Sequence, residues 1–225
     1  MKSSMYTSLI ISILIQIITG IMEFLSLFFH VPLQFSFLKK MMVLEVVVQF
    51  IEGLFYIYWL WNFKHIANIT PKRYFDWVLT TPTMLVNLIF YLLFLEHREK
   101  KTSDSMQFFQ LFHQEFSSIL TILMLNWAML LFGYLSEIAA IPLFLGLFLG
   151  FVPFLLYYYL IYQRYALLSK DGIKIFLYFF LFWSLYGIVA FFPYSLKNTC
   201  YNILDLFSKN FFGLFLFYLL FKNKE

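Results

Sequence analysis

The sequence is poor in charged residues and contains a single cysteine. Only 12% of its 225 residues are Asp, Glu, Lys or Arg, about half the fraction of a typical soluble domain. The lone cysteine, Cys200, has no partner for an internal disulfide. The four histidines are scattered, and no cluster of metal ligands or nucleophiles stands out. We therefore expect neither an internal disulfide nor an enzyme.

Apolar residues are correspondingly abundant. They make up 62% of the chain, and the mean hydropathy is +0.80, which indicates an integral membrane protein. Seven runs are long enough to span a bilayer as helices, since a spanning helix needs about 20 apolar residues and a barrel strand only about ten. The expected spans are Tyr6–Phe28, Met41–Phe63, Tyr74–Leu95, Gln107–Leu135, Ile138–Tyr162, Lys174–Tyr194 and Asn202–Phe221. The sequence thus predicts an all-α membrane protein, a single seven-helix bundle over residues 1–225 embedded in the lipid bilayer.

The basic residues that flank these spans predict the orientation, because cytoplasmic loops carry an excess of Lys and Arg. One side has ten of them: Lys39, Lys40, Arg98, Lys100, Lys101, Arg164, Lys170, Lys174, Lys222 and Lys224. The other side has five: Lys2, Lys64, Lys72, Arg73 and Lys197. This places the N-terminus outside and the C-terminus in the cytoplasm. The basic residues lie at loops and form no stripe, so nucleic acid is not an expected partner.

Polar side chains share one face of the third span. Arg73, Asp76, Thr80 and Asn87 are separated by three, four and seven residues, a helical spacing. A charged group within a bilayer costs at least about 2–3 kcal/mol and usually faces a functional interior. We therefore expect this face to look into a charged or hydrated site.

The last span contains Asp205 and Lys209, four residues apart and hence one turn from each other. They could simply neutralise each other as an ion pair. A lysine in a span rich in Leu, Phe and Ile is nevertheless costly, and a buried amine is also what Schiff-base formation requires. Lys209 is therefore a candidate for covalent attachment of an aldehyde.

Together, "RYFDWVLTTP" in the third span and "YNILDLFSKNFF" in the seventh resemble the microbial rhodopsins over essentially the whole chain. The resemblance implies all-trans retinal bound as a protonated Schiff base on Lys209, with Asp76 and Asp205 as the family's two aspartates. The segment "FWSLYG" is similar to the family's retinal-contacting segment. By this resemblance the retinal would be contacted by Trp77, Thr81, Trp183 and Tyr186.

The expected charges of such a site balance. A protonated Schiff base and Arg73 are positive, and Asp76 and Asp205 are negative, as a buried site of low dielectric requires. Thr80, one turn from Asp76, is expected to donate a hydrogen bond to its carboxylate.

A second polar set lies in the first two spans. Ser8, Ser12, Gln16, Thr19 and Glu23 share one helical face, and Glu45, Gln49 and Glu52 share another. Interhelical hydrogen bonding explains Ser and Thr in such positions. Two carboxylates in one apolar span are harder to explain without water or cations. With Asn202, these stripes could line a hydrated path.

Three functions remain open at this stage. Acidic second helices resemble those of light-gated cation channels, and the overall sequence resembles the rhodopsins of large algal viruses, which would make Ser12, Glu52 and Asn202 a central constriction. Asn87 stands at the family's proton-donor position, and an amide cannot return a proton. A channel for monovalent cations or protons is therefore favoured, an outward proton pump is the alternative, and a sensory receptor is the third. Assembly into a homo-oligomer is left open.

Overall fold

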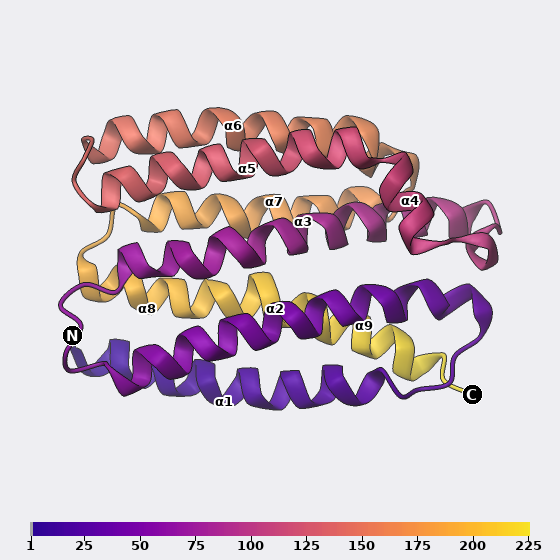
Figure 1. Ribbon diagram of the computed structural model, residues 1–225, viewed down its shortest axis with the longest axis horizontal. Helices are drawn as coiled ribbons and strands as arrows, with labels where there is room; N and C mark the ends of the chain where they lie inside the picture. The colour runs from indigo at the N-terminus through magenta and orange to yellow at the C-terminus, as the bar shows by residue number, and fades with distance from the viewer. Residues whose placement is uncertain (1) are drawn as a thin grey trace.

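Residues 2–225 are described by the computed structural model, with side chains from Ser4 onward. They form a bundle of helices along the longest axis of the molecule, with the two chain ends at opposite ends of the bundle (Figure 1). We refer to these as the N-terminal end and the C-terminal end. Met1 of the predicted domain and the side chain of Lys2, used in the orientation argument, lie outside the described residues.

Seven segments of the described chain are long and apolar enough to cross a bilayer. Six are single helices: α1 (Lys2–Ser26), α2 (Ser36–Trp61), α3 (Thr70–Glu99), α5 (Phe116–Glu137), α6 (Leu143–Arg164) and α7 (Gly172–Val189). The seventh is continuous but composite: α8 (Tyr194–Asp205), a π-helical turn (Leu206–Asn210) and α9 (Phe211–Lys222). The predicted all-α, seven-helix membrane bundle is thus confirmed, and the chain is an integral multi-pass membrane protein.

The predicted fourth span, Gln107–Leu135, starts too early. The chain first forms the short helix α4 (Phe108–Gln114) and turns at Glu115 before α5 begins. Phe108 packs on Phe90 of α3, with ring centroids 4.8 Å apart. Residues apolar enough to extend a span therefore cover the C-terminal end of the bundle instead (Figure 1).

The predicted seventh span, Asn202–Phe221, starts too late, because the helical segment already begins at Tyr194. Its first turns carry Asn198 and Asn202, both fully buried against other helices. A search for apolar runs does not detect a helix whose first turns are polar. The other five predicted spans match their helices, with ends shifted by a few residues.

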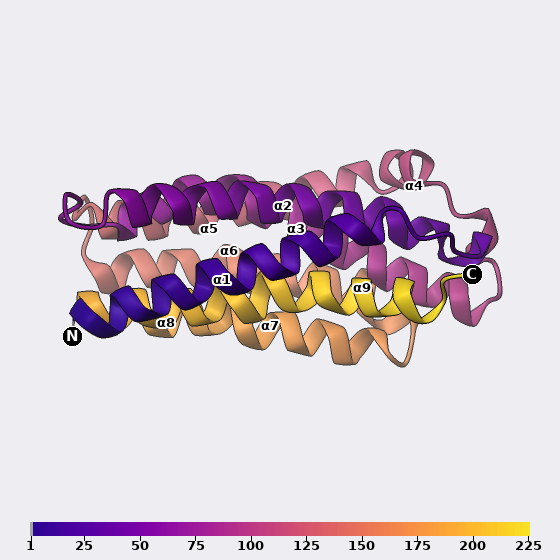
Figure 2. The ribbon, with the colours of Figure 1, turned by 90° about the horizontal axis from the view of Figure 1, so that it is seen from below.

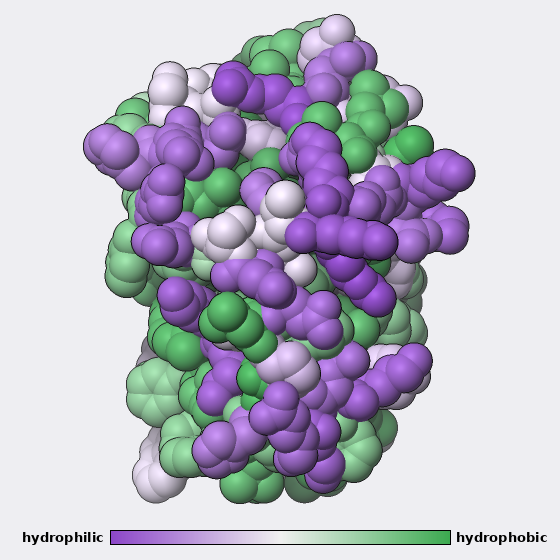
Figure 3. All heavy atoms as spheres, turned by 90° about the vertical axis from the view of Figure 1, so that its right-hand side faces the viewer, coloured by the Kyte–Doolittle hydropathy of each residue, from purple (hydrophilic) through white to green (hydrophobic). Residues whose placement is uncertain are grey.

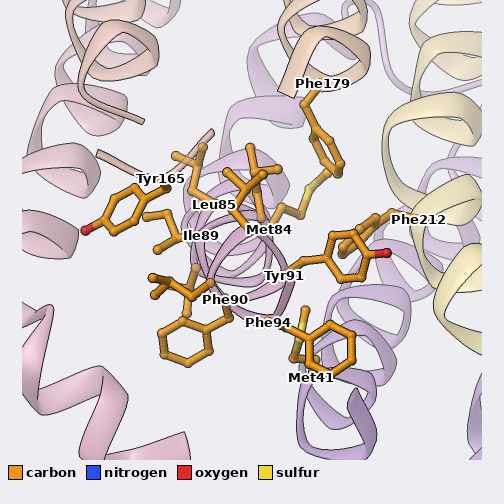
Figure 4. Packing of buried hydrophobic residues seen from close by; sticks show 14 of the residues in the cluster. Met41, Met84, Leu85, Ile89, Phe90, Tyr91, Phe94, Tyr165, Phe179 and Phe212 are labelled. Carbon is orange, nitrogen blue, oxygen red and sulfur yellow. The ribbon is translucent and has the colours of Figure 1, made fainter. Parts of the chain in front are cut away.

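Helix α3 is the centre of the bundle, and 83% of its apolar segment is buried, more than in any other span. In its second half, residues 84–95, the side chains point in every direction into neighbouring helices, where they meet Met41 of α2, Phe179 of α7 and Phe212 of α9 (Figure 4). A helical stretch that is apolar on nearly all sides is typical of a buried helix. This central position places Arg73 and Asp76, on the same helix, in the interior.

Pro82 interrupts the hydrogen-bond ladder of α3, since proline has no N–H to donate to the carbonyl four residues earlier. The indole Nε1 of Trp127 in α5 donates to that carbonyl, Val78 O, at 3.1 Å. The interhelical bond satisfies an acceptor that would otherwise be unpaired in the membrane.

Helix α1 lies along α8 and α9 (Figure 2). The face at the C-terminal end of the bundle is mostly hydrophilic (Figure 3), and its exposed basic residues include Arg98, Lys100, Lys170 and Lys222. Along the sides, large apolar residues such as Phe75 and Phe148 are exposed, as expected for surfaces that contact lipid.

Candidate functional site

Lys209 lies at the centre of the buried polar site, and three carboxylates surround its amine. The Nζ atom is 2.8 Å from Asp76 Oδ2, 3.4 Å from Glu52 Oε1 and 3.7 Å from Asp205 Oδ1. Lys209 itself is 3% exposed. It belongs to the π-helical turn, an irregularity that often occurs at functional sites. Asp76 and Asp205 thus lie close to the Lys209 amine, as the sequence predicts.

Asp205 connects this amine to Arg73. Its Oδ2 atom accepts a hydrogen bond from Arg73 Nη1 at 3.1 Å and one from Tyr56 Oη at 2.7 Å, while Tyr186 Oη donates to Oδ1 at 2.7 Å. Arg73 is fully buried and also donates to the side-chain oxygens of Asn198 and Asn202. Such multiple hydrogen bonds are what a buried guanidinium requires.

The charge balance expected from four groups is incomplete, because the structure adds Glu52. Two cationic side chains, Arg73 and Lys209, are grouped with three carboxylates. An uncompensated buried charge is costly, so one of the three carboxylates must carry a proton or lie beside a cation. Both oxygens of Glu52 are without a hydrogen-bond partner within residues 4–225, which makes Glu52 the first candidate.

The expected hydrogen bond from Thr80 to the Asp76 carboxylate is absent from the described residues. The Thr80 hydroxyl donates instead to the backbone carbonyl of Asp76, at 3.0 Å. Threonine within a helix commonly bonds to the carbonyl four residues before it. Asp76 Oδ1 therefore has no partner in the part of the chain that is described.

A largely apolar cavity begins at Lys209 and extends between α3, α5, α6 and α7. The predicted cofactor-binding residues Trp77, Thr81, Trp183 and Tyr186 all line it, with Met84, Met129, Phe151 and Phe154 among the apolar ones. Aromatic and apolar walls with an amine at one end suit a long, flat, apolar aldehyde. The residues present therefore fit the retinal that the resemblance implies.

Near the N-terminal end, Ser12 and Asn202 of the predicted constriction lie together. Ser12 Oγ donates to the backbone carbonyl of Asn202 at 3.3 Å, and Asn202 Nδ2 donates to Ser8 Oγ at 2.9 Å. Glu52, the third member, makes no hydrogen bond to either and approaches Lys209 instead. Among these three residues, hydrogen bonds thus join Ser12 to Asn202 only, and Glu52 lies beside the amine.

The polar stripe continues beyond Lys209. Gln49 Nε2 donates to the Gln16 carbonyl at 3.1 Å, and Asn210 Nδ2 donates to Gln49 Oε1 at 3.0 Å and to Thr19 Oγ1 at 2.7 Å. All four side chains are buried. Both amide atoms of Gln16 lack a partner within the described chain, as expected for a group that water would satisfy.

Asn87 lies closer to the C-terminal end and is not alone there. Its Nδ2 donates to Glu45 Oε1 at 2.6 Å and to the Met41 carbonyl at 3.2 Å. The position thus lacks a carboxylate on α3 itself, but α2 supplies one.

Several site residues were missed by sequence reasoning. Tyr56, Asn198 and Asn126 all make buried hydrogen bonds to predicted site residues, the last by donating from Nδ2 to Thr81 Oγ1 at 2.8 Å. A helical-spacing signal existed for two of them: Tyr56 is four residues from Glu52, and Asn198 is four from Asn202. Asn126 had no partner in its own span that could have identified it.

Comparisons with known proteins identify the fold. Residues 4–223 match the model of a family described as bacteriorhodopsin-like protein, and no curated protein gives a significant match. The crystal structure of the viral rhodopsin OLPVRII is similar with a TM-score of 0.81 and 28% identity, covering 97% of this chain and 98% of that one.

More distant structures share the fold alone. Acetabularia Rhodopsin I has a TM-score of 0.75 at 15% identity, covering 98% of this chain and 94% of that one. The thermophilic rhodopsin from Rubrobacter xylanophilus has a TM-score of 0.73 at 20% identity, covering 97% and 96%. The family match spans nearly the whole chain and agrees with the buried lysine, its aspartates and the seven helices: this chain belongs to the bacteriorhodopsin-like family of microbial rhodopsins, whose members are not enzymes.

Proposed function

We propose that this chain is a light-gated cation channel whose path runs between α1, α2 and the α8–α9 span. The observation that carries the proposal is the file of buried polar side chains between these helices, from Ser12, which contacts Asn202, to Glu23 near the C-terminal end. Glu23 and Glu45 in this file form no ion pair within residues 4–225. Carboxylates in a membrane interior are stable beside water or cations, and they attract cations over anions.

Lys209 is the proposed attachment point of all-trans retinal, through condensation of its amine with the aldehyde and loss of one water. Bound retinal supplies absorption of visible light and isomerisation. Asp76, 2.8 Å from Nζ, holds the positive charge at that atom and can accept its proton. Arg73, Tyr56 and Tyr186 fix the position of Asp205, so the second carboxylate is held in place next to the amine.

Glu52 joins the amine site to the proposed path. It lies 3.4 Å from Lys209 Nζ and is completely buried. A change in charge or position at Nζ therefore acts directly on a side chain of the proposed constriction. This contact supports gating of the path by the pigment.

We also propose that the C-terminal end faces the cytoplasm. The support is the excess of Lys and Arg at that end, whose face is mostly hydrophilic (Figure 3). With this orientation Arg73 and Asn198 lie on the external side of Lys209, and Glu45 and Glu23 lie on its cytoplasmic side.

An outward proton pump is the second candidate, and one observation favours it. Carboxylates lie on both sides of the amine: Asp76 next to Nζ, and Glu45 at 2.6 Å from Asn87 farther toward the C-terminal end. An acceptor and a donor are the two groups that such a pump needs.

Photocurrents under voltage control distinguish the two functions. Cells that express the protein with retinal are stepped through a range of voltages under light, while sodium, potassium and protons are exchanged outside. A channel lets ions run down their gradient, so we expect the current to reverse near the equilibrium potential of the permeant cation. Lys209→Ala is the control and should give no current. A strictly outward current, insensitive to external cations, would establish the pump.

A further inference from the structure

Glu23 is the last polar residue of the α1 stripe and has no place in the constriction or the amine site. Its side chain is 1% exposed, and Oε2 has no hydrogen-bond partner within residues 4–225. No basic side chain of that range pairs with it. An unpartnered buried carboxylate is stable only with a proton, water or a cation nearby.

Gly213 of α9 makes room for this carboxylate. A Cβ atom built on Gly213 would overlap Glu23 Oε1 and lie 2.6 Å from the carboxyl carbon, closer than side chains pack. Only glycine therefore lets the Glu23 carboxyl group lie directly against the α9 backbone. Gly213 follows Lys209 by four residues, about one helical turn.

The neighbourhood is polar and incompletely hydrogen-bonded. Between Glu23 and Lys209, Gln16 and Asn210 have side-chain atoms without a partner in the described part of the chain. Buried polar atoms without protein partners are where water or a cation is expected.

We propose that Glu23, positioned by Gly213, forms a second constriction that binds a monovalent cation near the C-terminal end of the path, separate from the one at Ser12, Glu52 and Asn202. This inference rests on the proposed channel function. Carboxylate oxygens are favourable ligands for such cations, and a ring of acidic groups at a narrow point selects cations over anions. Because Gly213 follows Lys209 by one turn, a movement of the lysine-bearing segment would shift the wall against which Glu23 rests.

Two substitutions and a matched control test this site. Glu23→Gln keeps the size and removes the charge, and Gly213→Ala displaces the carboxylate, which is the far end of a flexible side chain. Gly53→Ala makes the same chemical change where a Cβ meets no atom within 4 Å. The readouts are the visible absorption band, which reports folding, and the sodium photocurrent with its reversal potential when sodium is replaced by a large organic cation.

We expect normal absorption in all three variants. The sodium current should fall by about threefold or more in Glu23→Gln and in Gly213→Ala, and the sodium-dependent shift in reversal potential should shrink. Gly53→Ala should match the wild type. In a Glu23→Ala background, Gly213→Ala should have little further effect, because no carboxylate is left to displace.

The outcomes separate the two proposals. A reversing wild-type current together with unchanged current and selectivity in Glu23→Gln would overturn the second constriction and leave the channel in place. If Gly213→Ala reduced the sodium current as much in the Glu23→Ala background as it does alone, the positioning role of Gly213 would be overturned. A wild-type current that is outward at every voltage would overturn the channel, and the second constriction with it. Should Gly213→Ala not form pigment, Glu23→Gln alone decides.

Discussion

Asn87 Nδ2 lies 2.6 Å from Glu45 Oε1, so an amide of α3 and a carboxylate of α2 form one buried pair. A position that carries no acid in its own helix thus has one from its neighbour. A channel would use Glu45 to attract a cation, whereas a pump would use it to hold a proton. The two proposed functions therefore differ in the role of this pair.

Replacing Glu45 with Gln keeps a partner for Asn87 and removes the ionisable group. For a channel we expect a smaller cation current, while the pigment returns to its dark state within about threefold of the wild-type rate, since Glu45 supplies no proton to the amine. Flash spectroscopy and patch clamp on the same variant measure both. Recovery slowed by about tenfold or more, with a strictly outward current, would assign Glu45 as a proton donor.

Lys209→Ala should abolish the pigment. The amine is the only basic side chain that lines the described cavity, so the aldehyde has no other partner there. Expressed protein with added retinal should stay colourless, whereas wild type develops a visible band. Lys174→Ala, at an exposed lysine, is the control that should remain coloured. A normal visible band from Lys209→Ala would contradict the assignment of Lys209 as the attachment point of retinal.

Asp76→Asn should change the colour most among the carboxylate variants, because Asp76 is the nearest to Nζ at 2.8 Å. Removing its negative charge destabilises a positive charge at Nζ. We expect a red-shifted band while the amine site stays protonated, or a near-ultraviolet band where it loses its proton. Absorption spectra across neutral pH measure this. An unchanged spectrum would transfer the role to Asp205.

Glu52→Gln should leave the colour largely intact and should reduce the photocurrent or change its ion selectivity. The count of three carboxylates against two cations requires one neutralised acid, and Glu52 is the one without hydrogen bonds among the described residues. If it holds a proton, its replacement changes little charge near Nζ. Infrared difference spectra should lose a protonated-carboxyl band in this variant. A large colour shift would show that Glu52 is ionised in the dark.

Trp127→Phe should destabilise the bundle by about 0.5–1.5 kcal/mol, the usual net value of one hydrogen bond. The variant removes the donor to Val78 O, the carbonyl that Pro82 leaves unpaired. Thermal bleaching of the pigment measures the loss. In a Pro82→Ala background the helix supplies its own N–H, so Trp127→Phe should cost less there. Equal losses in both backgrounds would contradict the compensation.

The sequence by itself determined the class of this protein and identified the charged residues of its interior. Seven apolar runs are long enough to span a bilayer, and lipid leaves helices as the structure for runs of that length. Arg73, Asp76, Asp205 and Lys209 were identifiable because charges are rare and costly in such runs. Helical spacing placed each pair on one face, since 3.6 residues complete a turn.

Only the tertiary structure decided which helix faces which. The approach of Glu52 to Lys209, the pairing of Glu45 with Asn87 and the fit of Glu23 against Gly213 all join residues from different helices. Spacing within one helix carries no information about these contacts, because the rotation and depth of each helix are set by packing against its neighbours. Thr80 shows the same limit. Its hydroxyl donates to the backbone carbonyl of Asp76 and not to the Asp76 carboxylate, although both lie one turn away.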